Sequence, residues 1–232
     1  QLSKTAETYH NLTNRKMKKT AIKLSILLLA LVVTTPIEAS GSFKLGGSLI
    51  DSTDSVTLSS SFKQKWEHDK WQHDLAGTFN FQEQGGKETT NRYYLSGKSI
   101  YTFLPKHYAF GLASVDNNRF RTDRQRIIGA VGYGYKILRT ERIKASNEFS
   151  FAQLESDYKS ELIWRNSFWF AYKVTENVSF VNKYLVENSD YTRNETNLTY
   201  KFENGVTLGF SNLYTDDEID DNITSFNLGY TW

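Results

Sequence analysis

The sequence predicts an all-β chain that folds into a closed antiparallel transmembrane β-barrel of about twelve strands, preceded by a cleavable signal peptide. Aromatic residues make up 15% of the 232 residues, while Pro occurs twice and Met once, a composition suited to strands. Apolar residues recur at every second position over stretches of about ten residues, the length with which a tilted strand crosses a bilayer. The mean hydropathy of −0.54 is compatible with a barrel, because only alternate residues face lipid.

The first forty residues have the order of a secretory signal peptide. A basic segment at 17–23 opens with the sole methionine and is followed by ten mostly apolar residues at 24–33. Pro36 and Ala39 then supply a helix breaker and a small residue, and we expect cleavage after Ala39. A membrane-anchoring helix is the alternative, but it needs ~20 apolar residues.

These boundaries divide the chain into three parts. Residues 1–16 lack apolar periodicity and are interpreted as a disordered upstream extension, 17–39 as the signal peptide and 40–232 as the barrel. Residues 1–40 hold six Lys/Arg and two Asp/Glu, which leaves 22 basic and 24 acidic residues, so nothing favours a nucleic-acid partner. An exported chain without cysteine has neither a disulfide nor the lipidated cysteine of a bacterial lipoprotein.

The expected strands follow one another with short polar turns between them and no helical periodicity. Strand by strand, the apolar alternation covers 43–49, 56–66, 75–81, 93–103, 108–112, 131–137, 143–151, 162–174, 178–186, 198–202, 206–210 and 226–232. An even number of strands places both termini on the same side of the membrane. A soluble β-sandwich is the rival interpretation, but its strands are usually shorter, at ~5–6 residues.

Aromatic residues gather beside the short turns, on the side of the barrel that holds the termini. They are Trp66, Trp71, Phe103, Tyr108, Tyr135, Tyr172, Phe202 and Trp232. Aromatic rings prefer the membrane–water interface. We therefore predict an interfacial girdle at the periplasmic rim.

Basic residues occupy the strand face opposite to the apolar one. The expected lumen-lining residues are Lys44, Lys63, Lys65, Lys98, Lys136, Lys144, Arg165, Lys173, Lys183 and Lys201. Acidic residues expected on this face are few, chiefly Asp74 and Glu148. A cationic lining attracts anions, so any pore is predicted to be anion-preferring, although the side chains of a small barrel can also fill its interior.

No catalytic or metal-binding constellation emerges. His68 and His73 flank one turn beside Asp69 and Asp74, but their spacing matches no zinc pattern. No serine stands in a nucleophile-elbow context, so we expect no enzyme activity and no cofactor. The acidic run 216–221 lacks the spacing of a calcium loop, and we interpret it as a solvated loop; divalent cations that bridge it to lipopolysaccharide are the alternative.

A basic cluster is expected on the extracellular side. It consists of Arg119, Arg121, Arg124 and Arg126. These arginines can pair with lipopolysaccharide phosphates or with the chain's own acidic loops.

Several short motifs resemble the family of salt-induced outer-membrane proteins, domain of unknown function 481. They are Trp71-Gln72-His73, Tyr108-Ala109-Phe110-Gly111, and Gly132-Tyr133-Gly134-Tyr135-Lys136-Ile137-Leu138 followed by Thr140-Glu141-Arg142. Asn118-Arg119-Phe120 departs from the family pattern, because Asn118 stands where an acidic residue is usual. The resemblance covers 41–232 and implies an outer-membrane barrel without an established reaction.

Two functions therefore remain open for a barrel in the outer membrane. The first is a small anion-preferring channel with a Lys-rich lumen, and the alternative is a non-conducting structural barrel related to salt or envelope stress. An enzyme and a soluble periplasmic barrel are less well supported. The expected partners are outer-membrane lipid, lipopolysaccharide and, through the C-terminal alternation ending at Trp232, the barrel assembly machinery. The sequence leaves the oligomeric state open.

Overall fold

A computed structural model describes residues 40–50, 55–120, 124–188, 191–216 and 221–232. The predicted leader lies outside this part of the chain, as do Arg121 and most of the acidic run 216–221. The described residues form one compact unit. No helix in the described part of the chain is long and apolar enough to cross a membrane.

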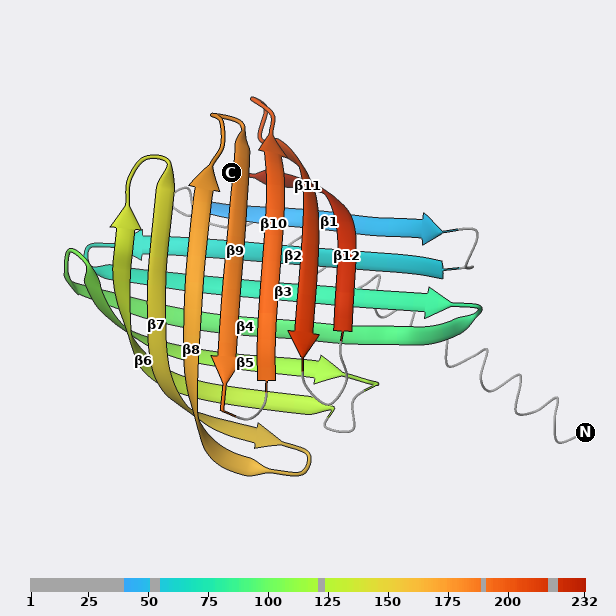
Figure 1. Cartoon of the computed structure of the whole chain (residues 1–232), viewed down its shortest axis with the longest axis horizontal. Helices are drawn as coiled ribbons and strands as arrows, with labels where there is room; N and C mark the ends of the chain where they lie inside the picture. The colour runs from blue at the N-terminus through green and yellow to red at the C-terminus, as the bar shows by residue number, and fades with distance from the viewer. Residues whose placement is uncertain (1–39, 51–54, 121–123, 189–190, 217–220) are drawn as a thin grey trace, which may run out of the picture. The chain divides into compact units, whose positions relative to one another are not determined.

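The predicted twelve-stranded antiparallel barrel is confirmed, and its strands close in sequence order with β1 against β12 (Figure 1). The strands are β1 Ser40–Ile50, β2 Ser55–His68, β3 Trp71–Gln84, β4 Lys87–Leu104, β5 His107–Asn118, β6 Gln125–Arg139, β7 Ile143–Ser156, β8 Ser160–Lys173, β9 Val178–Glu187, β10 Tyr191–Lys201, β11 Val206–Asp216 and β12 Asp221–Thr231. The front strands β7–β11 cross the rear strands β1–β5 steeply in Figure 1, as tilted strands on opposite walls of a barrel do.

Contacts between non-adjacent strands identify the interior face. Lys98 of β4 pairs with Glu148 of β7, and Arg126 of β6 pairs with Glu187 of β9. Such contacts must cross the inside of the barrel, because these strands are not neighbours. Residues two positions apart share a face, so these pairs fix the inward face of every strand.

The outward face is apolar and mostly exposed. Val131 is 70% exposed, Leu162 70% and Phe226 68%. A soluble protein rarely leaves so many large apolar side chains in water, whereas a lipid-facing wall requires them. This exterior is that of a membrane-spanning barrel.

Tyr108 corrects one part of the predicted girdle. It is 5% exposed, and its hydroxyl donates to Glu148 Oε1 at 2.7 Å inside the barrel. A register shift between Thr102 and Leu104 precedes β5, so Tyr108 and Phe110 face inward, opposite to the expectation.

Two glycines of β6 make room for these inward rings. A Cβ on Gly134 would lie 2.1 Å from Tyr108 Cζ, and one on Gly132 would lie 2.6 Å from Phe110 Cζ. Each ring therefore occupies the space that a side chain on the neighbouring strand would need. The two glycines of the Gly132-Tyr133-Gly134 motif thus leave the space that the Phe110 and Tyr108 rings fill.

Candidate functional site

The candidate site is the barrel lumen, and the strand register places every predicted lumen residue on its inward face. In the strand register, Lys63 and Lys65 of β2 stand opposite Ala76 and Asp74 of β3. Lys98 of β4 stands opposite Asp74 on the other side of β3. The same continuity of register assigns the inward face to Lys44, Lys136, Lys144, Arg165, Lys173, Lys183 and Lys201. These ten residues therefore lie on one continuous inner surface.

The end of the lumen that carries the short turns and the termini is open to water. Four inward-facing lysines are exposed: Lys63, Lys144, Lys183 and Lys201. An inward side chain can be exposed only if the lumen around it admits solvent. We call this region the basic basin.

The acidic content of the lumen was underestimated from the sequence. Besides Asp74 and Glu148, the inward face carries Asp116, Glu187 and Glu195. These residues lie near the loop ends of β5, β9 and β10, where the sequence alternation is least regular. The positive charge is therefore concentrated in the basic basin and is not uniform along the lumen.

Near the other end, a layer of buried charged side chains crosses the lumen. Arg92 is 1% exposed and donates two hydrogen bonds to Asp116, from Nε to Oδ1 at 2.9 Å and from Nη2 to Oδ2 at 2.5 Å. The same guanidinium donates to Tyr191 on β10 at 3.4 Å and to Thr215 on β11 at 3.5 Å. This one side chain thus joins walls on opposite sides of the barrel.

A second cluster continues the layer. Glu187, whose side chain is fully buried, accepts from Arg126 Nη2 at 2.7 Å and from Arg165 Nε at 2.8 Å. The Arg126 guanidinium also lies 4.4 Å from the centre of the Tyr191 ring. Tyr191 therefore links the two clusters, and we call Arg92, Asp116, Arg126, Arg165, Glu187, Tyr191 and Thr215 the septum.

Arg126 was predicted to belong to the extracellular basic cluster, and this prediction is wrong for that residue. Its side chain is 10% exposed and lies inside the barrel. Arg119 is half-exposed and pairs with Glu88 at 3.0 Å. The backbone N–H of Arg124 donates to Asp157 Oδ2 at 3.2 Å. The difference arises because β6 already begins at Gln125, which gives Arg126 an inward position.

An apolar cluster narrows the lumen further on the side of β5–β8. Ile128, Ala130, Ala152, Leu154 and Ile163 face inward and are buried, with Leu112 packed against them. On the opposite side, several inward residues of β11 and β12 are small and polar. Ser211 and Ser225 lie 2.8 Å apart, and Asn227 Nδ2 donates to Ser211 at 2.8 Å.

Between septum and basic basin, Glu148 forms a smaller polar group with Lys98 and Tyr108. The Lys98 ammonium also lies 4.2 Å from the centre of the Phe110 ring. These contacts hold Lys98 against β5 and β7, so it belongs to a packed region. It is a lumen residue, but not one with a mobile, water-exposed charge.

Ion pairs also lie at the rim of the short-turn end. Lys65 pairs with Glu67 at 2.5 Å, and Lys173 pairs with Glu176 at 2.5 Å. Glu176 lies in the β8–β9 turn, where the hydrogen bond from Lys173 and its charge lower the pKa of the carboxyl below its ordinary value. The rim lysines have local carboxylate partners, which weakens their pull on an incoming anion.

The remaining predicted girdle residues share the outward side of the short-turn end with further aromatic groups. Trp71 is 46% exposed and stacks on His73 with ring centres 6.0 Å apart. The strand register places five further girdle residues on the same outward side: Trp66, Tyr135, Tyr172, Phe202 and Trp232. His73 faces outward and Asp74 inward, so these neighbours do not form one site.

The septum is the part of the site that sequence reasoning missed. Arg92, Asp116 and Glu187 each lie in phase with the inward face of their strand, and this phase was the available signal. The contacts of Arg92 with Tyr191 and of Arg126 with Glu187 could not be read, because they join strands that are not neighbours.

A closed antiparallel barrel with an apolar, uncharged outer belt and a charged interior defines the class: a transmembrane barrel of the bacterial outer membrane. The chain belongs to the family described as Protein of unknown function, DUF481, which residues 46–232 match. No curated protein matches the sequence.

Solved structures of similar fold include porins and a translocator domain. The KdgM porin aligns with a TM-score of 0.50 at 7% identity, covering 82% of this chain and 98% of that chain. The NanC porin aligns with a TM-score of 0.47 at 10% identity, covering 82% and 97%. The translocator domain of autotransporter NalP from Neisseria meningitidis aligns with a TM-score of 0.44 at 10% identity, covering 93% and 97%. At these identities the similarity concerns the fold alone.

Proposed function

We propose that the protein is a narrow anion-preferring channel whose vestibule is the basic basin and whose constriction is the septum. One observation carries the proposal: inward-facing lysines are water-exposed at one end of a lumen that buried ion pairs cross at the other. In the usual orientation of outer-membrane barrels, the short turns and termini are periplasmic, so the vestibule opens to the periplasm.

The electrostatic argument rests on the unequal distribution of charge. Lys63, Lys144, Lys183 and Lys201 hold their charges in water at low-dielectric walls, which focus an attractive potential on anions. In the septum, by contrast, each arginine has a carboxylate partner. Selectivity is therefore assigned to the basic basin, and the septum limits conductance.

The test is ionic current across a planar bilayer containing the refolded chain 40–232 under unequal salt. Discrete steps with a reversal potential favouring anions are expected, and K63E combined with K183E should shift that potential towards cations. The pair Lys87→Glu and Lys159→Glu, outside the basin, has the same charge change and should leave the potential nearly unchanged. Equal shifts for both pairs would reject a selective basin.

The septum itself favours the second candidate, a non-conducting structural barrel with a role in salt or envelope stress. Arg92→Ala combined with Asp116→Ala removes a paired charge and opens space in the septum. A silent wild type and a conducting double variant would mean that the native barrel is closed. Measuring the protein's abundance in cells grown at low and high salt tests the stress role.

We further propose that residues 17–39 direct export and that β12 directs barrel assembly. Phe226, Leu228 and Tyr230 alternate on the outward face of β12, ahead of Trp232. Deleting Trp232 should leave export intact and leave the chain unassembled in the periplasm, as cell fractionation would detect.

A further inference from the structure

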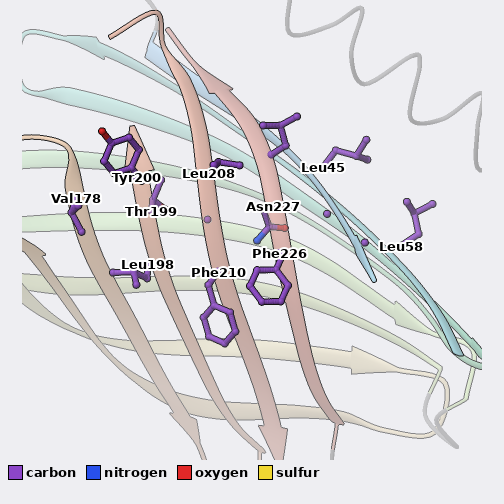
Figure 2. A pocket seen from close by; sticks show the side chains of 14 residues that line it. Leu45, Leu58, Val178, Leu198, Thr199, Tyr200, Leu208, Phe210, Phe226 and Asn227 are labelled. Atoms are coloured by element: carbon purple, nitrogen blue, oxygen red, sulfur yellow. The ribbon is translucent and has the colours of Figure 1, made fainter. Parts of the chain in front are cut away.

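The outer wall of β9–β12 differs from the rest of the exterior. Two apolar rows cross these strands, and the pairing register aligns them side by side. The row nearer the short turns contains Val178, Tyr200, Leu208 and Leu228 and continues to Leu45 of β1. The row farther from the short turns contains Phe180, Leu198, Phe210 and Phe226. Figure 2 shows Tyr200 and Leu208 along one side, and Leu198, Phe210 and Phe226 along the other.

A groove of about 760 Å³ lies between these rows. Its floor is backbone together with small residues, among them Gly46, Gly47 and Gly209, so the flanking side chains stand up as walls. It crosses the strands from β9 to β2, and the five spacings between six strands amount to ~24 Å. An apolar groove of this length accommodates one extended fatty-acyl chain.

Near its β1–β2 end, the groove passes the place where β1 separates from β12. In the described part of the chain, these strands pair from Ser42↔Thr231 to Gly46↔Asn227, while β1 continues to Ile50 against β2. Figure 1 shows β1 and β12 running in different directions beyond this point. The pairing ends at Gly46, and Gly46, Gly47 and Leu58 line this end of the groove.

On the side of the groove away from the short turns, hydrogen-bonding side chains replace apolar ones. One outward row contains Asn182, Thr196, Asn212 and Thr224, and the next contains Tyr184, Asn194, Tyr214 and Asn222. Asn182 Nδ2 donates to Thr196 Oγ1 at 2.9 Å, and Asn212 Nδ2 donates to Thr224 Oγ1 at 2.9 Å. No charged residue belongs to either row, and we call the two rows the amide patch.

The row of the amide patch next to the groove lies inside the apolar band. Thr224 is eight residues from Trp232, which at ~2.4 Å of axial rise per tilted residue places it about 19 Å above the girdle, within an apolar band of ~25 Å. On other walls, the residues at the same distance from the girdle are apolar. Leu95 lies eight residues before Phe103 on β4, and Trp164 lies eight residues before Tyr172 on β8. The hydrogen-bonding groups of a lipid that reach this depth would face the amide patch, whose carbonyl and hydroxyl oxygens can accept further hydrogen bonds.

We propose that this wall binds an outer-leaflet glycolipid built on an acylated amino sugar, the chemistry of lipid A. One acyl chain fills the groove, and the amide or ester groups at the start of the chains contact the amide patch. Asn side chains both donate and accept, and so do the amides and hydroxyls of an acylated amino sugar, whereas phospholipid esters only accept. A second barrel presents a convex wall, which would leave the concave groove empty.

The first experiment measures how much purified lipid A the full barrel retains against excess phosphatidylethanolamine in nanodiscs, by native mass spectrometry. The double variant Asn182→Leu and Asn212→Leu should reduce retention about tenfold, because each site loses hydrogen bonds at nearly constant volume. The matched control is Asn147→Leu with Asn166→Leu, an outward pair bonded at 3.1 and 3.2 Å on β7 and β8. Correct folding is checked by the heat-dependent gel shift.

A second pair of variants tests the groove. Leu208→Trp fills it and should lower lipid A retention at least fivefold, whereas Leu95→Trp, at a similarly exposed outward position, should not. Retention unchanged by both the amide and the groove variants would overturn the proposal. Equal retention of phosphatidylethanolamine, or dimers cross-linked through Asn212→Cys, would overturn it as well. None of these outcomes depends on whether the lumen conducts.

Discussion

Replacing Glu187 by leucine tests the septum most directly. The carboxylate is fully buried and accepts from Arg126 and Arg165 at 2.7 and 2.8 Å. Its loss leaves two guanidinium groups, each about one-tenth exposed, without their shared counter-charge. Removing one partner from a buried ion pair costs ~3–5 kcal/mol, and we expect E187L to lower the free energy of unfolding by this amount.

The measurement is urea unfolding of the refolded barrel in lipid vesicles, followed by the fluorescence of its five tryptophans. Glu195→Gln serves as the control. Its carboxylate is 37% exposed and lies 3.4 Å from Arg193, so the expected loss is about 1 kcal/mol or less.

A triple variant separates the ionic contribution from packing. Replacing Arg126 and Arg165 by methionine together with E187L removes every charge of this cluster at similar volume. Fully apolar replacement of a buried ionic cluster is often neutral, so most of the lost stability should return. A loss below 1 kcal/mol for E187L, or no recovery in the triple variant, would refute the view that the septum is a tightly coupled buried network.

Two further predictions concern the two faces of the wall. Gly134→Ala should destabilise the barrel by about 1–3 kcal/mol, because the new Cβ would overlap the Tyr108 ring. Gly97→Ala should not, because no atom lies within 4 Å of a Cβ at that position. Similar urea midpoints for the two variants would contradict the packing of the Tyr108 ring on Gly134. Val131→Lys should cost about 2–4 kcal/mol in vesicles, because an outward residue exposed by 70% faces lipid. Tyr158→Lys, in the β7–β8 loop, should cost little, and an equal loss would argue against Val131 facing lipid.

The alternation of apolar and polar residues determined the strands. Period two is a local property of an extended chain, so the outward faces of β8 and β12 were evident from Leu162 to Tyr172 and from Phe226 to Trp232. The abundance of lysine on the opposite face was equally local. Twelve strands and an inward basic face therefore required no knowledge of the tertiary structure.

The face of β5 was misjudged for a physical reason. Tyr108, Phe110 and Leu112 alternate like a lipid-facing strand, but a register shift after Thr102 and the glycines of β6 turn them inward. An aromatic ring fits either lipid or a slot above glycine, so its chemistry does not decide the face. The neighbouring strand decides it.

Barrel closure determined the rest of the site. Arg92 meets Tyr191 because closure brings β4 opposite β10, and Arg126 meets Glu187 because the curved wall turns β6 towards β9, three strands away. Sequence alternation shows that such residues point inward but not which of them meet across the lumen. The sequence by itself thus determined a barrel with a basic interior. The tertiary structure decided where that interior is open, where ion pairs cross it and where the outer wall is grooved.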